Sequence, residues 1–217
     1  MIDGAVPAPG SYDEQCRRCP RLAAYLDKVH GEHPDYFCKP VPPFGASAAR
    51  LLVVGLAPGL HGANATGRPF TGDWCGPLLY STLHRHGFAT RPESLGAGDG
   101  LELIDCRITN AVKCLPPQNK PERSEISRCN RFLAAELAHS DTLRVILTLG
   151  TIAHRAVLEA RALPSRDYPF AHHRVHRLPG GCALVNSYHV SRYNTQTRRL
   201  TPAMFDAVLA EIRSLLS

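Results

Sequence analysis

Residues 51–59 have the sequence Leu-Leu-Val-Val-Gly-Leu-Ala-Pro-Gly, a short apolar run that leads into a glycine-rich loop. A continuously apolar run of this length is typical of a strand that is buried on both faces of a sheet. Runs of the same kind occupy residues 104–112, 144–150 and 183–186. Four strands are therefore expected, and polar residues follow three of them.

Segments with a helical spacing of apolar residues come between and after these strands. They are expected at residues 11–30, 76–86, 123–139, from the third strand to about 161, and 202–216. Strands that alternate with helices predict right-handed crossovers and a parallel sheet with helices on both faces. No internal repeat or clear boundary divides the chain, so residues 1–217 are expected to form a single domain.

The chain has 217 residues, of which 44% are apolar, and a formal net charge of +6. This basic balance favours a polyanionic partner such as nucleic acid, although charge alone does not establish one. No apolar run approaches the roughly 20 residues that span a bilayer. Residues 1–9 also lack the basic start and apolar core of a secretory signal. We therefore expect a cytoplasmic protein without a membrane partner.

Eight cysteines are present, and four of them fall into two pairs. Cys16 and Cys19 form a C-x-x-C motif, whereas Cys114 and Cys129 flank a proline-rich loop. Four thiolates suit either a [4Fe–4S] cluster or a structural zinc ion, and the residues alone do not choose between the two. The remaining cysteines are Cys38, Cys75, Cys106 and Cys182. Small buried cysteines are common, but Cys38 is an alternative ligand because it lies in a loop near the first pair.

The loop after the first strand contains five glycines from Gly55 to Gly72 and leads to Asp73. Glycine permits close approach of the backbone, so this loop can wrap a planar ligand or a phosphate. It contains neither the Walker A nor the G-x-G-x-x-G motif, which argues against a nucleotide cofactor. Phe70 is either a core residue or a stacking surface for a base. Asp73 is a helix cap, a catalytic carboxylate, or both.

Asn110 and His189 follow the second and fourth apolar runs. Open α/β sheets bind ligands at the carboxyl ends of their strands, so we expect Asp73, Asn110 and His189 to meet there. The amide of Asn110 can pair with N3–H and O4 of uracil, or it can satisfy turn backbone instead. A lone histidine is often structural, but two polar neighbours favour catalysis by His189. The histidine-rich residues 172–176 are expected to be an exposed basic loop without a catalytic role.

Three motifs resemble those of the uracil-DNA glycosylase superfamily, and most closely those of its family-five members. They are Gly-Leu-Ala-Pro-Gly-Leu-His-Gly-Ala-Asn-Ala-Thr-Gly-Arg-Pro-Phe-Thr-Gly-Asp at 55–73, Thr-Asn-Ala-Val-Lys-Cys at 109–114 and Asn-Ser-Tyr-His-Val-Ser-Arg-Tyr-Asn-Thr at 186–195. The resemblance implies a three-layer α/β/α sandwich with a central four-stranded parallel sheet. It also implies a monofunctional hydrolase that excises uracil, and other deaminated bases such as hypoxanthine, from DNA to start base excision repair.

The resemblance assigns a role to each candidate residue. Ionised Asp73 would stabilise the sugar cation and position water, His189 would donate a hydrogen bond to O2 of the leaving base, and Asn110 would contact the base edge. The base would pack against Gly55, Leu56, Ala57 and Phe70. The DNA would contact Ser191, Arg192, Tyr193, Lys120 and Arg123. A [4Fe–4S] cluster would bind Cys16, Cys19, Cys114 and Cys129.

A few positions depart from the family pattern. Ala57 stands where other branches carry a polar residue, which leaves the acidic role to Asp73. Val190 replaces the usual proline and is expected to loosen its loop, and Trp74-Cys75 is expected to change the edge of the pocket. Two other functions stay open: a non-catalytic protein that binds DNA lesions, and a zinc-stapled hydrolase of free nucleosides or nucleotides. The expected substrate is double-stranded DNA, with single-stranded DNA as a second candidate, and the expected enzyme is a monomer.

Overall fold

The structure is a computed structural model that describes residues 12–217. The expected absence of a secretory signal at residues 1–9, and the first residue of the helix expected at 11–30, lie outside the described residues. The strands are β1 (Leu51–Gly55), β2 (Cys106–Asn110), β3 (Val145–Leu149), β4 (Val175–Arg177) and β5 (Ala183–Ser187). They form one sheet in the order β2-β1-β3-β5-β4. The four predicted strands β1, β2, β3 and β5 are parallel, which confirms that expectation.

The fifth strand corrects the prediction of a four-stranded sheet. β4 pairs antiparallel with β5 at the edge of the sheet, within the histidine-rich segment that was expected to be a loop. The sequence does not predict it, because its three residues are only part-buried or exposed and so form no apolar run. An edge strand needs to bury less of its surface than a central one.

The helices are α1 (Pro20–Glu32), α2 (Ala63–Thr66), α3 (Cys75–Arg85), α4 (Arg123–Ala138), α5 (Thr151–Ala160), α6 (Arg192–Gln196) and α7 (Pro202–Leu216). Of the helices predicted from the sequence, only α1 differs much from its expected bounds, whereas the short helices α2 and α6 were not predicted. It begins at Pro20, because proline lacks an N–H group and suits the first turn of a helix. Cys16 and Cys19 therefore precede the helix, and a turn links Cys16 N–H to the carbonyl oxygen of Asp13 at 3.3 Å.

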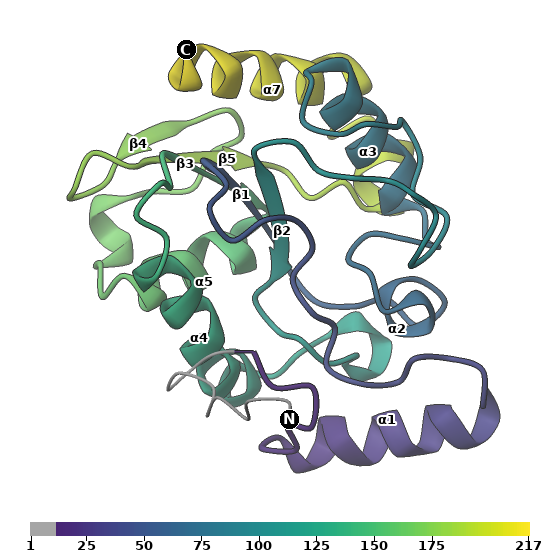
Figure 1. The fold of residues 1–217 in the computed structure, drawn as a ribbon. Coiled ribbons are helices and arrows are strands. Elements are labelled where there is room, and N and C mark those ends of the chain that lie inside the picture. The colour runs from purple at the N-terminus through teal and green to yellow at the C-terminus, as the bar shows by residue number, and fades with distance from the viewer. Residues whose placement is uncertain (1–11) are drawn as a thin grey trace, which may run out of the picture.

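The sheet lies between two layers of helices, as expected for a three-layer α/β/α sandwich. Figure 1 shows α3 and α7 on one side of the sheet and α4 and α5 on the other. Alternate residues of each strand supply the two cores, since successive side chains of a strand point to opposite faces. Val53 and Leu147 pack with α3 and α7, whereas Val54 and Ile146 pack with α4 and α5.

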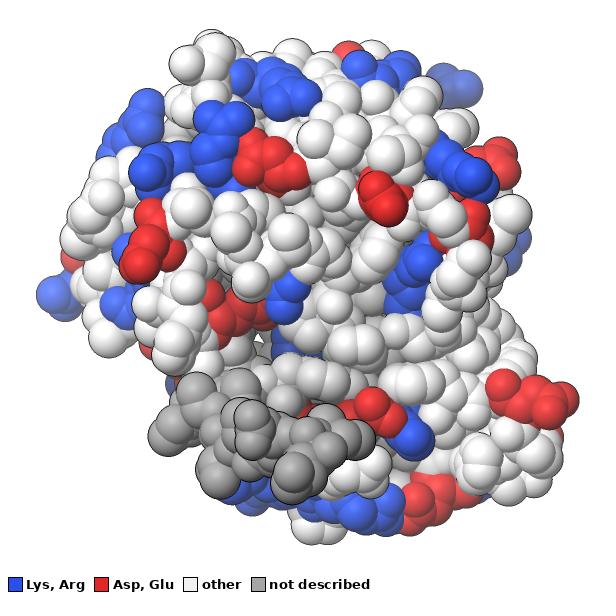
Figure 2. Space-filling model, viewed as in Figure 1, with Lys and Arg blue, Asp and Glu red and all other residues white. Residues whose placement is uncertain are grey.

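The surface of the molecule is mixed in charge. On the face seen in Figure 2, Lys and Arg side chains are interspersed with Asp and Glu, so this face carries no continuous cationic surface. Several of the basic side chains are paired with acids, as in the Arg50–Asp105 pair at 2.6 Å. Among residues 12–217, no helix has the length and apolar character that crossing a membrane requires.

Candidate active site

A small pocket opens at the carboxyl ends of β1 and β2. The structure brings Asp73, Asn110 and His189 into this one pocket, although they are far apart in the sequence. Its lining consists of Ala57, Gly59, Ala63, Phe70, Asp73, Cys75, Asn110 and His189. A wider mouth continues outward from it and shares Asp73 and His189 with it. The register of the sheet helps to build the pocket, because Gly55 of β1 lies directly beside Asn110 of β2.

Asp73 lies at the start of α3 and is held by backbone N–H groups. Its Oδ1 accepts a hydrogen bond from Cys75 N–H at 2.9 Å, and its carbonyl oxygen accepts one from Gly76 N–H at 3.3 Å. A Cβ on Gly62 would lie 2.5 Å from Oδ2, so the glycine-rich loop packs directly against the carboxylate. Burial raises the pKa of Asp73, and the hydrogen bonds from Cys75 and Gly76 partly oppose this rise. Asp73 thus both caps the helix and presents a carboxylate to the pocket.

Asn110 presents a buried acceptor that no protein group satisfies. The residue is only 3% exposed, and its Oδ1 has no hydrogen-bond partner among the described residues. The close approach of this oxygen depends on Gly55, where a Cβ would lie 2.4 Å from Oδ1 and 2.4 Å from Cζ of Phe70. An unpaired buried acceptor costs free energy, roughly 1–3 kcal/mol. A ligand with an N–H donor would recover that cost.

Phe70 forms one wall of the pocket and also belongs to the core. Its ring centroid lies 6.3 Å from that of His189, and the two planes are tilted by 36°. The backbone at Phe70 has φ +55°, an uncommon conformation for a bulky residue. Strained backbone of this kind is concentrated at binding and catalytic sites. The position of Phe70 therefore fits both a core residue and a stacking surface for a base.

His189 is a neutral imidazole at neutral pH. Burial lowers its pKa to about 4, because the charged form is poorly solvated in the pocket. Its carbonyl oxygen accepts a hydrogen bond from Nδ2 of Asn194 at 2.8 Å, which anchors the loop to α6. Val190 is completely buried in the core rather than loosely placed, so it anchors the same loop. A neutral imidazole can donate one hydrogen bond to a developing anion.

The mouth of the pocket is built by α6 and by the residues that follow Asp73. Ser191 caps α6, and its Oγ accepts a hydrogen bond from Asn194 N–H at 3.5 Å. Tyr193 is 69% exposed and Trp74 is 54% exposed. Trp74 and Cys75 line the mouth, at the edge of the pocket where the sequence placed them. The mouth also includes Leu60, His61 and Asn119, to which the sequence analysis gave no individual role.

The remaining residues predicted to contact base or DNA are spread around the pocket. Leu56 lines the mouth, whereas Gly55 lies beneath the pocket and acts as a spacer. Lys120 is exposed and directly follows Asn119, which lines the mouth. Arg123 opens onto a separate groove that it shares with Arg155, so the structure does not bring it to the mouth.

The cysteine pairs meet in space. Cys16, Cys19, Cys114 and Cys129 line one cavity next to Lys113 and Arg128. Within residues 12–217, however, no three His, Cys, Asp or Glu side chains are arranged closely enough to hold a metal ion, so the metal site stays a prediction. Cys38 does not line this cavity, and its Sγ accepts a 3.5 Å hydrogen bond from Nδ2 of Asn64.

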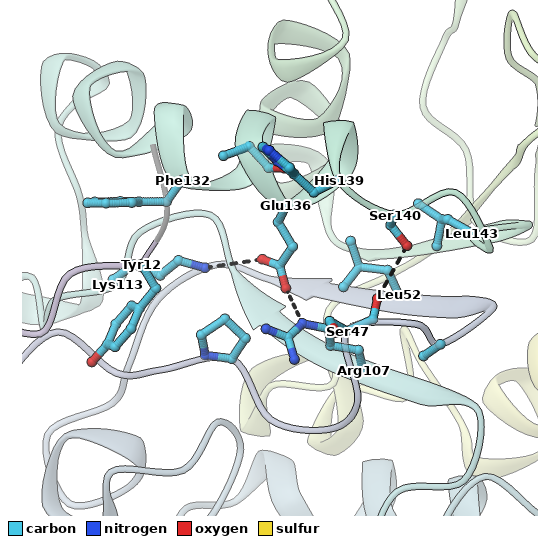
Figure 3. Close-up of a pocket in the computed structure, with 13 residues that line it drawn as sticks. Tyr12, Ser47, Leu52, Arg107, Lys113, Phe132, Glu136, His139, Ser140 and Leu143 are labelled. Carbon is cyan, nitrogen blue, oxygen red and sulfur yellow. Dashed lines mark hydrogen bonds and ion pairs between the residues drawn. The ribbon is translucent and has the colours of Figure 1, made fainter. Parts of the chain in front are cut away.

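A second buried polar cluster lies on the other face of β2. Figure 3 shows Glu136 between Lys113 and Arg107, in a cavity between β2 and α4. Glu136 Oε1 is 2.5 Å from Nε of Arg107, and its Oε2 is 3.8 Å from Nζ of Lys113. Lys113 is 1% exposed, and its ammonium group also donates to Oγ1 of Thr109. Every charge in this cluster therefore has a partner.

Comparison with known proteins places the chain in a family. The family model of the uracil DNA glycosylase superfamily matches residues 42–213. A type-5 uracil-DNA glycosylase of Thermus thermophilus is 48% identical over 205 residues, which cover 92% of this chain and 93% of the relative. A type-5 enzyme of Mycobacterium leprae is 40% identical over 221 residues, which cover 98% and 96% of the two chains. A type-4 enzyme of Pyrobaculum aerophilum is 37% identical over 147 residues, or 67% of this chain.

The matched residues 42–213 include all five strands and the strand-end pocket described above. The chain belongs to the uracil-DNA glycosylase superfamily. Within that superfamily it groups with type 5, because the type-5 relatives cover almost its whole length. The family predicted from the three sequence motifs is thus confirmed.

Proposed function

We propose that this protein is a uracil-DNA glycosylase, which flips a uracil nucleotide out of DNA and hydrolyses its N-glycosidic bond. The unpartnered Oδ1 of Asn110, in one pocket with Asp73 and His189, is the observation that carries the proposal. Uracil has an N3–H donor for this oxygen, whereas N3 of cytosine is an acceptor and would be repelled. The names and high identity of the type-5 relatives support the same function.

The pocket supplies two groups of opposite character for the reaction. Cleavage of the C1′–N1 bond leaves positive charge on the sugar and negative charge on the departing base. Ionised Asp73 would stabilise the sugar cation and direct a water molecule to C1′. Neutral His189 would donate a hydrogen bond to O2 of the base, which would leave as an anion. Phe70 would stack on the base in the pocket.

The DNA would lie across the mouth of the pocket. Flipping a nucleotide out of a duplex costs a few kcal/mol, so a residue that fills the vacated space assists the reaction. Arg192 and Tyr193 are exposed, and Ser191 holds the turn that presents them. Lys120, beside the mouth, would contact a phosphate, and Arg123 would contact the backbone farther away. Phosphate contacts of this kind set position without reading sequence.

The substrate range would extend beyond uracil. Asn110 can present either a donor or an acceptor, and Ala57 adds no polar group to the lining. We therefore expect hypoxanthine to be excised as well, in double-stranded and single-stranded DNA. The enzyme would act as a monomer in the cytoplasm, and its abasic product would be the first intermediate of base excision repair.

Base release under single-turnover conditions tests the proposed function. The substrate is a labelled duplex with one U·G mismatch, and free deoxyuridine is assayed in parallel. We expect an alkali-labile abasic site in the duplex and no turnover of deoxyuridine. Tight binding without any product would indicate a lesion-binding protein instead. Turnover of deoxyuridine but not of the duplex would indicate a nucleoside hydrolase.

We also infer that Cys16, Cys19, Cys114 and Cys129 hold a [4Fe–4S] cluster. Their common cavity suits it, because Lys113 N–H donates to Sγ of Cys129 at 3.3 Å and the cationic side chain of Arg128 lines the same cavity. N–H···S bonds and nearby cations stabilise the negative charge of a thiolate-bound cluster. When bound, the cluster would act as a cross-link between the segment before α1, the end of the Asn110 loop and α4.

Replacement of one thiol at a time tests this cofactor. Cys114→Ser is expected to lose iron and the visible absorbance of the cluster, and to lower the melting temperature. Cys38→Ser serves as the matched control, because Cys38 is buried outside the cavity, and it is expected to retain iron. If Cys114→Ser kept its iron and Cys38→Ser lost it, Cys38 would be the fourth ligand.

A further inference from the structure

The mouth of the pocket carries an unusual concentration of exposed aromatic surface. Five large apolar side chains are exposed among residues 12–217, and two of them, Trp74 and Tyr193, line this mouth. Tryptophan and tyrosine are enriched at interaction sites, because their rings offer a large apolar face together with a polar group. Trp74 directly follows Asp73, so its ring lies at the rim of the pocket in which the base would be cleaved.

The Trp74 ring is held in place by α6. Its Nε1–H donates to Oγ1 of Thr195 at 2.9 Å, and the guanidinium of Arg192 lies 5.3 Å from the ring centroid. A cation at this distance from an indole face makes a favourable cation–π contact. The ring is therefore fixed before any ligand binds, yet 54% of the residue stays exposed. A group that is rigid and exposed loses little entropy when it binds.

The chemistry of the surrounding mouth matches DNA. Arg192 brings a positive charge, and His61 on the opposite loop adds a second ring. Aromatic side chains beside cations form the stacking platforms of proteins that bind single-stranded nucleic acid, and each stacked base contributes there without regard to sequence. Trp74 directly follows Asp73 in the sequence and lies at the mouth of the pocket. Its ring would therefore meet the base next to the nucleotide that occupies the pocket.

We propose that Trp74 stacks on the face of the base next to the extracted nucleotide, on the same DNA strand. This inference rests on the proposed function and adds a base-stacking residue to it. The contact needs one strand only, because the indole meets the face of a base and not its pairing edge. The enzyme should therefore bind a lesion in single-stranded DNA as well as in a duplex.

The fluorescence of the protein gives a direct test, because Trp74 is the only tryptophan of the chain. The probe is an oligonucleotide with a tetrahydrofuran abasic-site analogue, which binds but offers no base for excision. Single-stranded and duplex forms are both expected to quench the emission of the wild-type protein. Binding is measured separately by the anisotropy of labelled DNA. DNA that binds by anisotropy but leaves the emission unchanged would overturn the inference and leave the glycosylase proposal intact.

Four variants separate stacking from a structural role of the ring. Trp74→Ala should weaken binding of both probes roughly 5- to 150-fold, the equivalent of about 1–3 kcal/mol for one stacked base. Trp74→Phe should keep most of the affinity, and Thr195→Val, which removes only the hydrogen bond, should keep it too. Ile104→Ala is the matched control, since Ile104 is 48% exposed and precedes the amino end of β2, whereas the pocket opens at the carboxyl end of that strand.

The remaining outcomes are equally decisive. Equal losses in Trp74→Ala, Trp74→Phe and Thr195→Val would show that the ring only braces α6, and wild-type affinity of Trp74→Ala would show that it does not meet DNA. Either result overturns the inference. If the wild-type protein bound neither probe, the proposed function itself would fail together with it.

Discussion

Two buried polar clusters flank the end of β2, and they differ in whether their polar atoms have partners. On one face, Glu136 is paired with both Arg107 and Lys113. On the other face, among residues 12–217, Oδ1 of Asn110 has no partner, and Asp73 is a carboxylate in the pocket without a cation. Pairing is how a fold tolerates buried charge. Polar groups without partners in a pocket are available to bind a ligand. We therefore interpret the Glu136 cluster as structural and the Asn110 pocket as functional.

The largest expected effect is on the stability of the paired cluster. Glu136→Gln would leave the buried Lys113 and the half-buried Arg107 without their counter-charge. Breaking one partner of a buried ion pair costs about 3–5 kcal/mol, so the melting temperature should fall clearly. Thermal unfolding measures this change. A variant as stable as the wild type would show that the cluster is not a structural element.

His189→Ala should reduce the rate of uracil release by roughly 100-fold, the equivalent of about 3 kcal/mol, because it removes the donor to the leaving base. Single-turnover assays on the U·G duplex measure it. Stability should change little at neutral pH, in contrast to Glu136→Gln. A fall in DNA affinity with an unchanged chemical step would instead assign His189 to binding.

Asn110→Ala tests the unpartnered acceptor directly. It should slow uracil release about tenfold, or roughly 1.4 kcal/mol, through the lost hydrogen bond to N3–H. It should not lower the melting temperature, because the acceptor that is removed has no hydrogen-bond partner among residues 12–217. A strong loss of stability would mean that Asn110 stabilises the fold instead of being available to a ligand.

The smallest expected effect is on the pH dependence of the rate of uracil release. The reaction needs ionised Asp73, and burial raises the pKa of this group, so activity should fall with decreasing pH earlier than for an exposed aspartate. His189 has its pKa lowered to about 4 and stays neutral over most of this range. The acid limb of the single-turnover rate should therefore persist in His189→Asn. Its disappearance in that variant would assign the limb to the histidine.

The sequence predicts most of the fold because apolar runs mark buried strands. β1, β2, β3 and β5 are such runs, whereas β4 is a short edge strand without one. The start of α1 is missed because the spacing of apolar residues does not reveal the turn between Asp13 and Cys16 or the proline at the first helical position.

The candidate site shows the same division. Asp73, Asn110 and His189 are predictable because each lies at or beyond the carboxyl end of a strand, and the carboxyl ends of parallel strands lie at the same edge of a sheet. The missing partner of Asn110 is not predictable, since it depends on which side chains surround an atom in space. Arg123 was expected to contact DNA together with Lys120, which is close to it in the sequence. In the structure Arg123 is the first residue of α4 and lines a different groove.

The most direct measurement compares Asp73→Asn with the wild type in activity, DNA binding and stability together. Because burial raises the pKa of Asp73, its ionised form lowers stability as the pH rises through that pKa. At neutral pH the neutral asparagine should therefore be at least as stable. We predict retained melting temperature, retained binding of lesion DNA and a loss of uracil release of at least about 100-fold. Single-turnover release near the wild-type rate would contradict the account, because the pocket would then not depend on its carboxylate.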